Sequence, residues 1–343
     1  LEDSMVRKPA RIVIYFAIAM AAILTVAITL TIGWRPFIGP AARPLTGRRF
    51  ESTPARLERG QYLVEAVAGC FGCHSTHDWS LPGAPEQAGK KGAGRNMSEE
   101  GDFPGTVIAP NITPDPETGA GKWSDDALAR AIREGIAHDG RALFPLMPYQ
   151  SYRLLSDEDI ASVVVYLRSI PAVRNSLPKT ELKFPVSRLI FGAPHPITNP
   201  VPQPVFSSPV ERGTYLTKIA TCDGCHTPIK GGQPIAGMEF GGGSPIKTPS
   251  GTVSSANITP DASGISYYDE SLFLQAMRTG QVKARKLNPA MPWYGFGKMT
   301  DDDLKAIYAY LRTLTPVKHR VDNSLPPTQC KRCGGTHGAG FQN

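Results

Sequence analysis

The longest hydrophobic run of the chain extends from Ile12 to Ile32 and contains no charged residue. As an α-helix it would span about 31 Å, close to the roughly 30 Å of a bilayer's hydrocarbon core. A cleaved signal peptide usually has an apolar region of only about 7–15 residues, and the following Trp34 and Arg35 are typical of a membrane interface. We therefore expect an uncleaved transmembrane anchor that contacts membrane lipid.

Beyond residue 50, the apolar positions predict amphipathic helices separated by long loops. The clearest helix follows Ser156, where three acidic residues fill the first turn and Ile160, Val164 and Leu167 recur at helical spacing. The same pattern returns 144 residues later, after Thr300. Each of two further helix types also occurs twice: one around Gly60 and Gly213, the other from near Ser124 or Asp269 to Gly135 or Gly280.

These helices belong to two copies of one sequence unit, with the motifs in the same order. The matching segments are 59–63 and 212–216, 70–74 and 222–226, 111–115 and 257–261, 147–149 and 291–293, 166–171 and 310–316, and 175–178 and 323–326. A repeat of this extent indicates a duplication. Three helices per copy with long loops predict an all-α fold behind one transmembrane helix.

The repeat divides the chain into seven segments. They are an N-terminal segment (1–11), the anchor (12–32), a linker (33–52), the first unit (53–171), a connector (172–209), the second unit (210–320) and a C-terminal tail (321–343). The connector holds eight prolines, so we expect an extended segment without a core of its own.

Each unit contains the pentad Cys-x-x-Cys-His, which is the attachment motif of haem c. Two thiols add to the haem vinyl groups, and the adjacent histidine can then ligate the iron from one face. A redox dithiol does not need the histidine, and half a zinc site does not explain the same pentad in both units. We expect two covalently attached haem c groups, held by Cys70, Cys73 and His74 and by Cys222, Cys225 and His226.

The second axial ligand of each iron is expected to be Met147 or Met291, because each precedes a proline and an aromatic residue at the same repeat position. A thioether is a soft ligand that favours Fe(II), so His/Met ligation raises the reduction potential. Met97, Met238 and Met299 have no counterpart in the other unit, which is typical of loop or core residues.

The net charge of +7 is local, because residues 1–50 contribute +5 around the hydrophobic run. This distribution favours membrane headgroups as the partner and gives no support to nucleic acid. Residues 51–171 carry −6 and residues 210–320 carry +4. We hypothesise that the second unit meets an acidic redox partner through Lys283, Arg285 and Lys286, which lie just before Met291, and the first unit a basic one; an ordinary solvated loop is the alternative.

From the pentads, the Met-Pro-aromatic segments and the terminal helices of each unit, residues 55–320 resemble the class I cytochrome c family. The Asn-Ile-Thr-Pro-Asp segments resemble the cytochrome c subunits of membrane-bound bacterial dehydrogenases for alcohols, sugars and sugar acids, which usually carry three haem domains. The resemblance implies that Gly60 and Gly213 permit close helix crossing. It also implies that the carbonyl of Pro228, or of Thr76 in the first unit, orients the haem-ligating histidine, and that Asn111 and Asn257 lie near haem propionates.

The resemblance also implies a location, since haem c is attached outside the cytoplasmic membrane in such systems. The N-terminus would be cytoplasmic and both haem units periplasmic, on a single-pass protein of the inner membrane.

Cys330 and Cys333 form a third Cys-x-x-Cys, in which Gly334 replaces the histidine. Three interpretations remain open: a local disulfide, a small metal site with His337 that needs further ligands, or an exposed tail. His138 has no partner in the second unit, so we expect it on the surface.

We therefore expect a membrane-anchored electron carrier that is not itself an enzyme. It would pass single electrons between a dehydrogenase or quinol-oxidising complex and a respiratory acceptor. The alternatives are a peroxidase-type enzyme with two haems, which needs one open iron position, and the haem subunit of a terminal oxidase.

Overall fold

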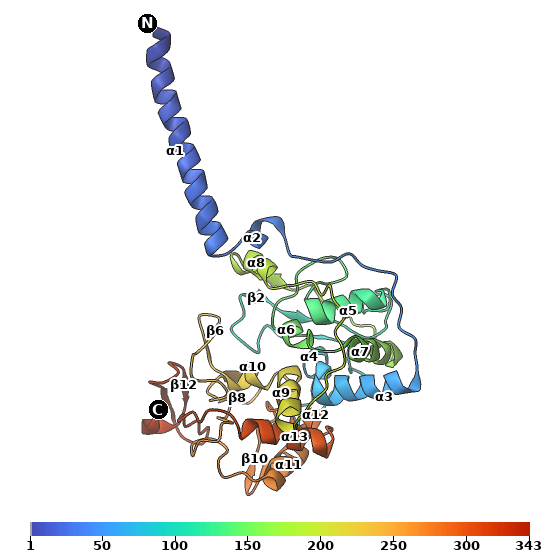
Figure 1. The fold of residues 1–343 in the computed structure, drawn as a ribbon. Coiled ribbons are helices and arrows are strands. Elements are labelled where there is room, and N and C mark those ends of the chain that lie inside the picture. Colours follow the sequence, from blue (N-terminus) through green and yellow to red (C-terminus); the bar gives the residue numbers. More distant parts are fainter. Residues whose placement is uncertain (1) are drawn as a thin grey trace.

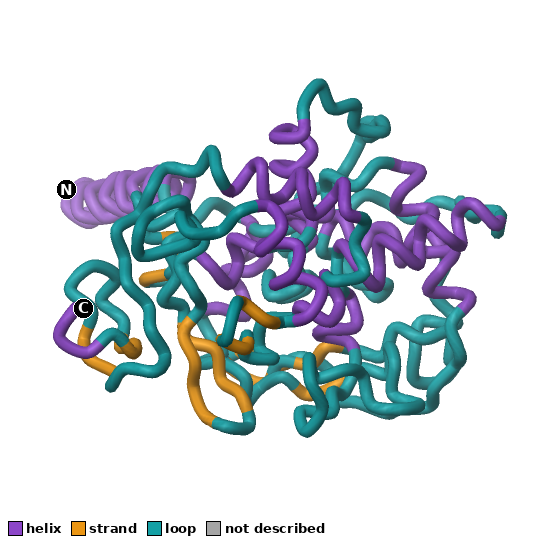
Figure 2. Tube along the Cα trace, turned by 90° about the horizontal axis from the view of Figure 1, so that it is seen from below, coloured by secondary structure: helices purple, strands orange, loops and turns teal. Residues whose placement is uncertain are grey.

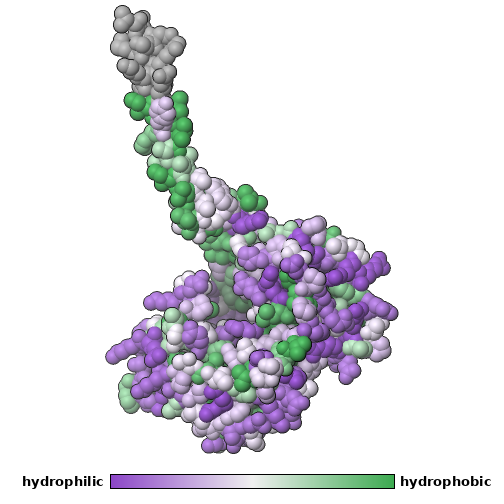
Figure 3. Space-filling model, in the orientation of Figure 1, coloured by the Kyte–Doolittle hydropathy of each residue, from purple (hydrophilic) through white to green (hydrophobic). Residues whose placement is uncertain are grey.

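The structure, a computed structural model, describes residues 2–343, with side chains from Ile12 onward. The long helix α1 (Glu2–Leu30) projects away from the rest of the molecule (Figure 1). Its stretch Ile12–Leu30 has a mean hydropathy of 2.5 and is not buried against the protein. Figure 3 shows this apolar surface beside a mostly hydrophilic body. By length and composition, α1 could therefore cross a membrane.

The two units contain the same series of helices. Those of the first unit are α3 (Pro54–Tyr62), the π-helix η1 (Leu63–Val67), α4 (Cys70–His74), α5 (Asp125–Glu134), α6 (Tyr149–Tyr152) and α7 (Asp157–Ser169). Those of the second are α9 (Pro209–Ile219), α10 (Cys222–His226), α11 (Glu270–Thr279), α12 (Trp293–Phe296) and α13 (Asp301–Leu311). Outside the units lie α2 (Arg35–Ile38), α8 (Val186–Leu189) and the 3₁₀ turns η2 (Ile190–Gly192) and η3 (Gly340–Gln342).

The predicted helix ends are confirmed by hydrogen bonds. The side chains of Ser124, Asp269, Ser156 and Thr300 each accept a backbone N–H of the first turn and so cap α5, α11, α7 and α13. Helices α5 and α11 end at glycines with left-handed φ angles of +72° and +66°.

The terminal helices of each unit cross without space for a side chain. A Cβ atom on Gly60 of α3 would lie 2.0 Å from the Ser162 carbonyl oxygen of α7, and one on Gly213 of α9 would lie 1.9 Å from the Ala306 carbonyl oxygen of α13. The expected role of both glycines is thus confirmed, since any side chain there would force the helices apart.

The expected all-α fold describes the helical part of both units, but among the described residues the loops also form six two-stranded antiparallel ladders. The ladders are β1 (Arg95–Asn96) with β3 (Ile108–Ala109), β2 (Gly105–Thr106) with β4 (Glu181–Leu182), β5 (Ile229–Lys230) with β6 (Gln233–Pro234), β7 (Pro245–Thr248) with β8 (Gly251–Ser254), β9 (Gln281–Val282) with β10 (Arg285–Lys286), and β11 (Pro327–Gln329) with β12 (Thr336–Gly338). Most have only two residues per strand, too few for a recognisable alternation of polar and apolar residues. Figure 2 shows these strands among the loops, outside the central helices.

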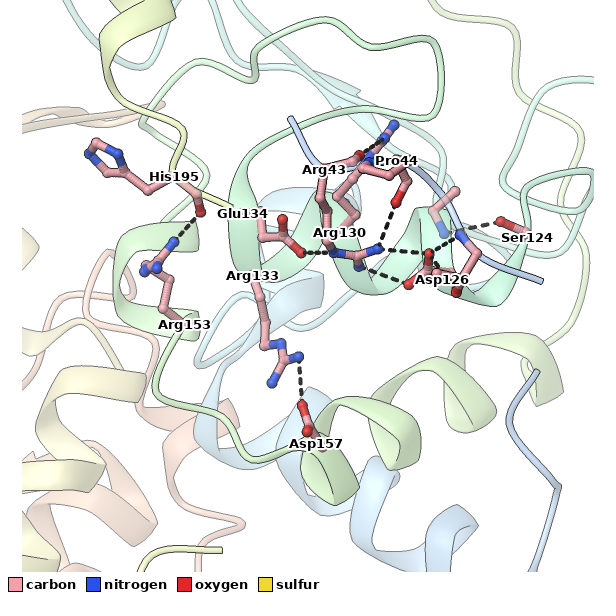
Figure 4. A network of polar contacts seen from close by, with 12 residues as sticks. Arg43, Pro44, Ser124, Asp126, Arg130, Arg133, Glu134, Arg153, Asp157 and His195 are labelled. Carbon is pink, nitrogen blue, oxygen red and sulfur yellow. Dashed lines mark hydrogen bonds and ion pairs between the residues drawn. The ribbon is translucent and has the colours of Figure 1, made fainter. Parts of the chain in front are cut away.

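The linker between α1 and the first unit is bound to α5. Arg43 donates two hydrogen bonds of 2.8 Å to Asp126 and one of 2.9 Å to Glu134, and both carboxylates are almost fully buried (Figure 4). The backbone N–H of Thr46 also donates to Asp126, at 2.7 Å. The buried guanidinium of Arg130 donates to the Arg43 carbonyl oxygen. This network holds the linker on one face of the first unit.

The connector is more than an extended spacer. Its strand β4 pairs with β2, and Leu182 packs against a small apolar cluster of the first unit that includes Met97, Val107 and Phe144. Its helix α8 contacts α2, which directly follows α1 (Figure 1). The connector therefore fixes part of the first unit and lies beside the base of the hydrophobic helix.

The two units pack on each other with an approximate twofold relation. Helix α6 of the first unit contacts α9 of the second, while α12 of the second contacts η1 of the first. At one end of the contact, Asp303 accepts hydrogen bonds from Arg212 of its own unit and from Tyr62 of the other. At the other end, Asp159 accepts a hydrogen bond from Arg59. Burial of the half-buried Tyr215 raises its pKa, and the charge of Asp159 raises it further.

Candidate haem-binding cavity

All eight predicted haem-binding residues line one continuous cavity of about 2620 Å³ between the two units. Helices α4 and α10 present the cysteines and histidines, and the loops before α6 and α12 present Met147 and Met291. The rest of the wall is largely hydrophobic, with residues such as Phe144, Leu167 and Phe296. A large apolar cavity with thiols, imidazoles and thioethers on its wall fits two haem groups.

The two histidines are oriented by equivalent backbone carbonyls. His74 Nδ1 lies 2.7 Å from the carbonyl oxygen of Pro110, and His226 Nδ1 lies 2.7 Å from that of Ala256. Because Nδ1–H donates to the carbonyl, Nε2 keeps its lone pair for a metal. Burial lowers the pKa of both imidazoles, whereas the carbonyl contact raises it, and the net shift favours the neutral form that binds iron.

The expectation that Pro228 or Thr76 supplies this carbonyl is therefore wrong. The Pro228 carbonyl accepts from the Ile235 N–H, and the Thr76 carbonyl accepts from the Gln87 N–H. The two residues lie close to the histidines in sequence, but their carbonyls belong to the turns that follow the pentads. The observed acceptors lie 36 and 30 residues after the histidines, immediately before Asn111 and Asn257.

The side-chain amides of Asn111 and Asn257 are bonded to the backbone, although Asn257 also lines the cavity, and their position near haem propionates stays a prediction. Each side-chain oxygen accepts from the backbone N–H two residues later, and each Nδ2 donates to a backbone carbonyl, that of Val173 or Val317. Both asparagines are at least 96% buried. They fix the loop that places the Pro110 and Ala256 carbonyls, and so they act on the histidines through the backbone.

The basic residues expected near the second haem lie beside the cavity. Arg285 and Lys286 form strand β10 and line the opening, with both side chains exposed. Lys283 lies in the turn between β9 and β10, with its Nζ 5.3 Å from the centre of the Tyr267 ring. Like-charged groups at a cofactor opening attract partners of opposite charge.

The remaining candidate residues are largely buried. Met97, Met238 and Met299 are core residues, as expected, whereas His138 is exposed and stacks on Trp123. Cys330 and Cys333 are buried, which argues against an exposed tail, and the structure does not join them in a disulfide. They lie beside His337 and beside His319, a residue that the sequence analysis did not identify.

Two parts of the chain are similar to one known protein family. The profile of the cytochrome c family matches residues 57–171 and 210–315. A nicotinate dehydrogenase subunit of Pseudomonas putida is 36% identical over 217 residues, which are 62% of this chain but 17% of that protein.

Other relatives share more of the chain. The fructose dehydrogenase cytochrome subunit of Gluconobacter japonicus is 31% identical, over 77% of this chain and 54% of its own length. A dihaem cytochrome c-type protein of Cereibacter sphaeroides is 27% identical, over 78% of this chain and 89% of its own length. For the nicotinate dehydrogenase subunit, and for the gluconate 2-dehydrogenase cytochrome c subunit of Pantoea cypripedii, the match spans less than two thirds of the relative.

Two family matches coincide with the two pentad-bearing units, and the cavity between them presents the thiols and neutral imidazoles that covalent haem attachment requires. The chain therefore belongs to the cytochrome c family and carries two covalently bound haem c groups.

Proposed function

We propose that this protein is a membrane-anchored subunit that passes single electrons between a dehydrogenase and a respiratory acceptor. The observation that carries the proposal is the single cavity shared by both haem-attachment sites. When bound, the haem irons supply the one-electron chemistry, while the protein sets their ligands, surroundings and separation. No acid, base or nucleophile is needed from the chain.

The two attachment sites lie close together inside the cavity. Cys73 of α4 and Cys225 of α10 both line its wall, one from each unit. A shared cavity brings the two cofactors together, which supports electron transfer within the chain.

We assign His74 with Met147 to one iron and His226 with Met291 to the other. Each methionine lines the same cavity as its histidine and precedes a four-residue helix, α6 or α12. The aromatic residue that begins each helix holds the methionine loop against the end of α5 or α11, because ring atoms of Tyr149 and Trp293 lie beside Gly135 and Gly280. The protein thereby limits how far each thioether can move from the cavity.

The hydrophobic helix and its linker support a place at the inner membrane. Helix α1 would anchor the chain as a single span, with both haem units in the periplasm. Because Arg43 fixes the linker on α5, the first unit would keep a defined orientation to the bilayer. The proposed partners are membrane lipid around residues 12–32 and redox proteins on either side of the haem pair.

The relatives support a dehydrogenase as one of these partners. Three of those named above are cytochrome subunits of fructose and gluconate dehydrogenases, or a subunit of nicotinate dehydrogenase. These enzymes act on different small organic molecules, so the shared element is transfer of electrons rather than a substrate. We assign this chain the electron-transfer role and no catalytic role of its own.

The test is to solubilise membranes that contain the protein and identify the proteins that purify with it. We expect a dehydrogenase subunit, two haems per chain, and reduction of both haems when that enzyme's substrate is added. Met147→His and Met291→His should each lower the potential of one haem by at least about 0.1 V, because a harder ligand stabilises Fe(III).

Met238→Leu is the matched control, because Met238 is buried and does not line the cavity. Its two haem potentials should remain unchanged. A native spectrum with one five-coordinate haem, together with rapid peroxide turnover, would contradict the proposal and support the peroxidase-type alternative.

A further inference from the structure

Four buried side chains converge where the C-terminal tail meets the second unit. His319 follows α13, while Cys330, Cys333 and His337 belong to the tail around β11 and β12. Their potential ligand atoms all lie within 4.8 Å of one another, and the four residues are at least 93% buried. Nothing in the haem chemistry requires this cluster, because it lies apart from both pentads in the sequence and has no repeat counterpart.

We propose that His319, Cys330, Cys333 and His337 bind one Zn²⁺ ion in a closed, structural site. Structural zinc is usually held in a tetrahedron of four protein ligands, and two cysteines with two histidines are a common set. Zinc bonds of about 2.0 Å to nitrogen and 2.3 Å to sulfur put neighbouring ligand atoms roughly 3.3–3.8 Å apart. The observed separations of His319 Nε2 are 3.0 Å to His337 Nε2 and 3.3 Å to Cys330 Sγ.

Surrounding backbone groups prepare these side chains for a metal. His319 Nδ1 lies 2.8 Å from the Gly241 carbonyl oxygen, so Nδ1–H donates there and the lone pair of Nε2 faces the cluster. The N–H groups of Arg332 and Gly335 each lie 3.4 Å from a cysteine sulfur, Cys330 Sγ and Cys333 Sγ respectively. Such donors stabilise the negative charge of thiolates, which is the form that binds zinc.

The alternatives explain fewer of these contacts. A disulfide between Cys330 and Cys333 would not require two buried imidazoles whose Nε2 atoms face each other at 3.0 Å. If His337 carries its proton on Nδ1, two lone pairs repel across this gap, and a cation between them removes the repulsion. Because all four ligands come from the protein and are buried, no position is open for a substrate, which favours a structural role over a catalytic one.

The site would join the tail to the loop that orients His226. The His319 ring packs on Gly243, where a Cβ atom would lie 2.7 Å from the ring carbon Cε1. The neighbouring Gly242 N–H donates to the His226 carbonyl, and Asn257 Nδ2 donates to the His319 carbonyl. Ala256, which accepts His226 Nδ1–H, precedes this asparagine. A metal at the cluster therefore stiffens the wall behind the second haem and leaves the first untouched.

The test uses the full-length protein, solubilised from membranes and purified without a histidine tag. Elemental analysis should give one zinc and two irons per chain, and X-ray absorption at the zinc edge should show two sulfur and two nitrogen neighbours. Cys333→Ser and His337→Ala should lower bound zinc to about a tenth of a zinc per chain or less, because a ligand is lost. His138→Ala is the matched control, since His138 is exposed, and it should keep its zinc.

A second measurement remains informative if a ligand variant does not fold. The folded protein is alkylated with and without prior chelation, a third sample is alkylated after denaturation to count all thiols, and the peptide containing Cys330 and Cys333 is weighed in each case. Two alkylated thiols, accessible in the folded protein only after chelation, support the zinc site. A peptide two hydrogens lighter, which is a disulfide, overturns it, as does copper or iron in place of zinc, or no metal at all.

The consequence for the second haem gives an independent readout. Removal of zinc with a chelator should shift the spectrum or potential of the haem bound by His226 and leave that of the haem bound by His74 unchanged. An equal change at both haems, or none, would show that the site does not support the His226 wall. This outcome does not depend on which redox partners the protein has.

Discussion

The middle helices of the two units, α5 and α11, have the same length, equivalent caps and an arginine in the last turn. One face of α5 is nevertheless buried, whereas the same face of α11 is exposed to solvent. In α5, Asp126, Arg130 and Glu134 are buried beneath the linker. In α11, the residues at those positions are Ser271, Gln275 and Thr279, and all three are exposed. In this protein the helix face with charged residues, on α5, is the buried one. The equivalent face of α11, with neutral polar residues, is the one exposed to solvent.

A second difference concerns the support of the loop behind each histidine. In the first unit, Asn175 Nδ2 donates to the Ala93 carbonyl at 2.8 Å. In the second, the same contact is made by His319 Nδ1 to the Gly241 carbonyl, also at 2.8 Å. His319, and not Asn323, is therefore the structural counterpart of Asn175. Both units therefore make this backbone contact, but through different residues. In the second unit the residue is a histidine, whose other ring nitrogen, Nε2, faces His337 of the tail.

The duplication retained what orients the two pentad histidines and changed what surrounds the units. The glycine crossings, the caps and the carbonyls that accept Nδ1–H occur in both. Among the described residues, the contacts of Arg43 with Asp126 and Glu134, here called the linker clamp, occur only in the first unit. The cysteine–histidine cluster occurs only in the second.

The largest effect should come from removing a feature that both units share. Gly213→Ala places a Cβ atom 1.9 Å from the Ala306 carbonyl oxygen, and Gly60→Ala places one 2.0 Å from that of Ser162. Each change should cost about 3 kcal/mol or more, because backbone and not a flexible side chain must move. Guanidinium unfolding followed at each haem should show the loss first in the altered unit. Gly47→Ala is the control, because Gly47 lies in an exposed loop where a Cβ atom meets nothing. Equal loss in both units would break the comparison.

Arg43→Gln should destabilise the first unit alone, by about 2 kcal/mol, because it leaves buried Asp126 and Glu134 without their cation. Burial acts to raise the pKa of Asp126, but the hydrogen bonds from Arg43 and Thr46 lower it overall. The stabilisation is therefore complete above about pH 4 and is lost as pH falls through the lowered pKa. Hydrogen exchange of residues 42–50 at pH 7 and pH 3 measures the clamp.

The control for this clamp is Arg35→Gln, because Arg35 lies in α2 and is exposed. If Arg43→Gln left the exchange of residues 42–50 unchanged at both pH values, the clamp would have no role in holding the linker.

A smaller effect is expected where the units meet. Asp303→Asn weakens the hydrogen bonds from Arg212 and from Tyr62 of the other unit, and should cost about 1–2 kcal/mol. Burial and the Asp303 contact raise the pKa of Tyr62 to about 12, so its hydroxyl remains a donor at neutral pH. Tyr62→Phe should reproduce the part of the loss that couples the units. Asp159→Asn is the matched variant, and its effect should lie mainly within the first unit, since Tyr215 makes no hydrogen bond there.

The smallest effect concerns rates and not stability. Reversing Lys283, Arg285 and Lys286 to glutamate should slow electron exchange with an acidic partner several-fold at low salt, and less at high salt, because screening removes the attraction. Lys305→Glu with Arg312→Glu is the control, because these residues lie on α13 and at its C-terminal cap, outside the cavity wall. Salt-dependent kinetics that match those of the control would show that these three basic residues do not attract a redox partner.

Some charged residues of the two units pair within the molecule. Glu65 of the first unit pairs with Lys298 of the second, and Asp102 pairs with Lys247.

The sequence by itself determined what depends on neighbours along the chain. The pentads, the helix caps, the apolar periodicity and the long hydrophobic run are local patterns, so they indicated two haem c units behind one apolar helix. The sequence also contained a signal for His319, because the offset of 144 residues that relates Met147 to Met291 relates Asn175 to His319. The repeated Asn-Ser-Leu-Pro segments suggested instead that Asn175 corresponds to Asn323.

Only the tertiary structure decided which distant groups meet. The carbonyls of Pro110 and Ala256, the clamp on Arg43 and the fourth member of the cysteine–histidine cluster come from segments with no shared local pattern. A hydrogen bond or a metal bond depends on atoms within about 3.5 Å, and chain folding sets that distance independently of sequence separation. For the same reason the short strands of the loops were missed, because two residues of pairing depend on the partner and not on their own composition.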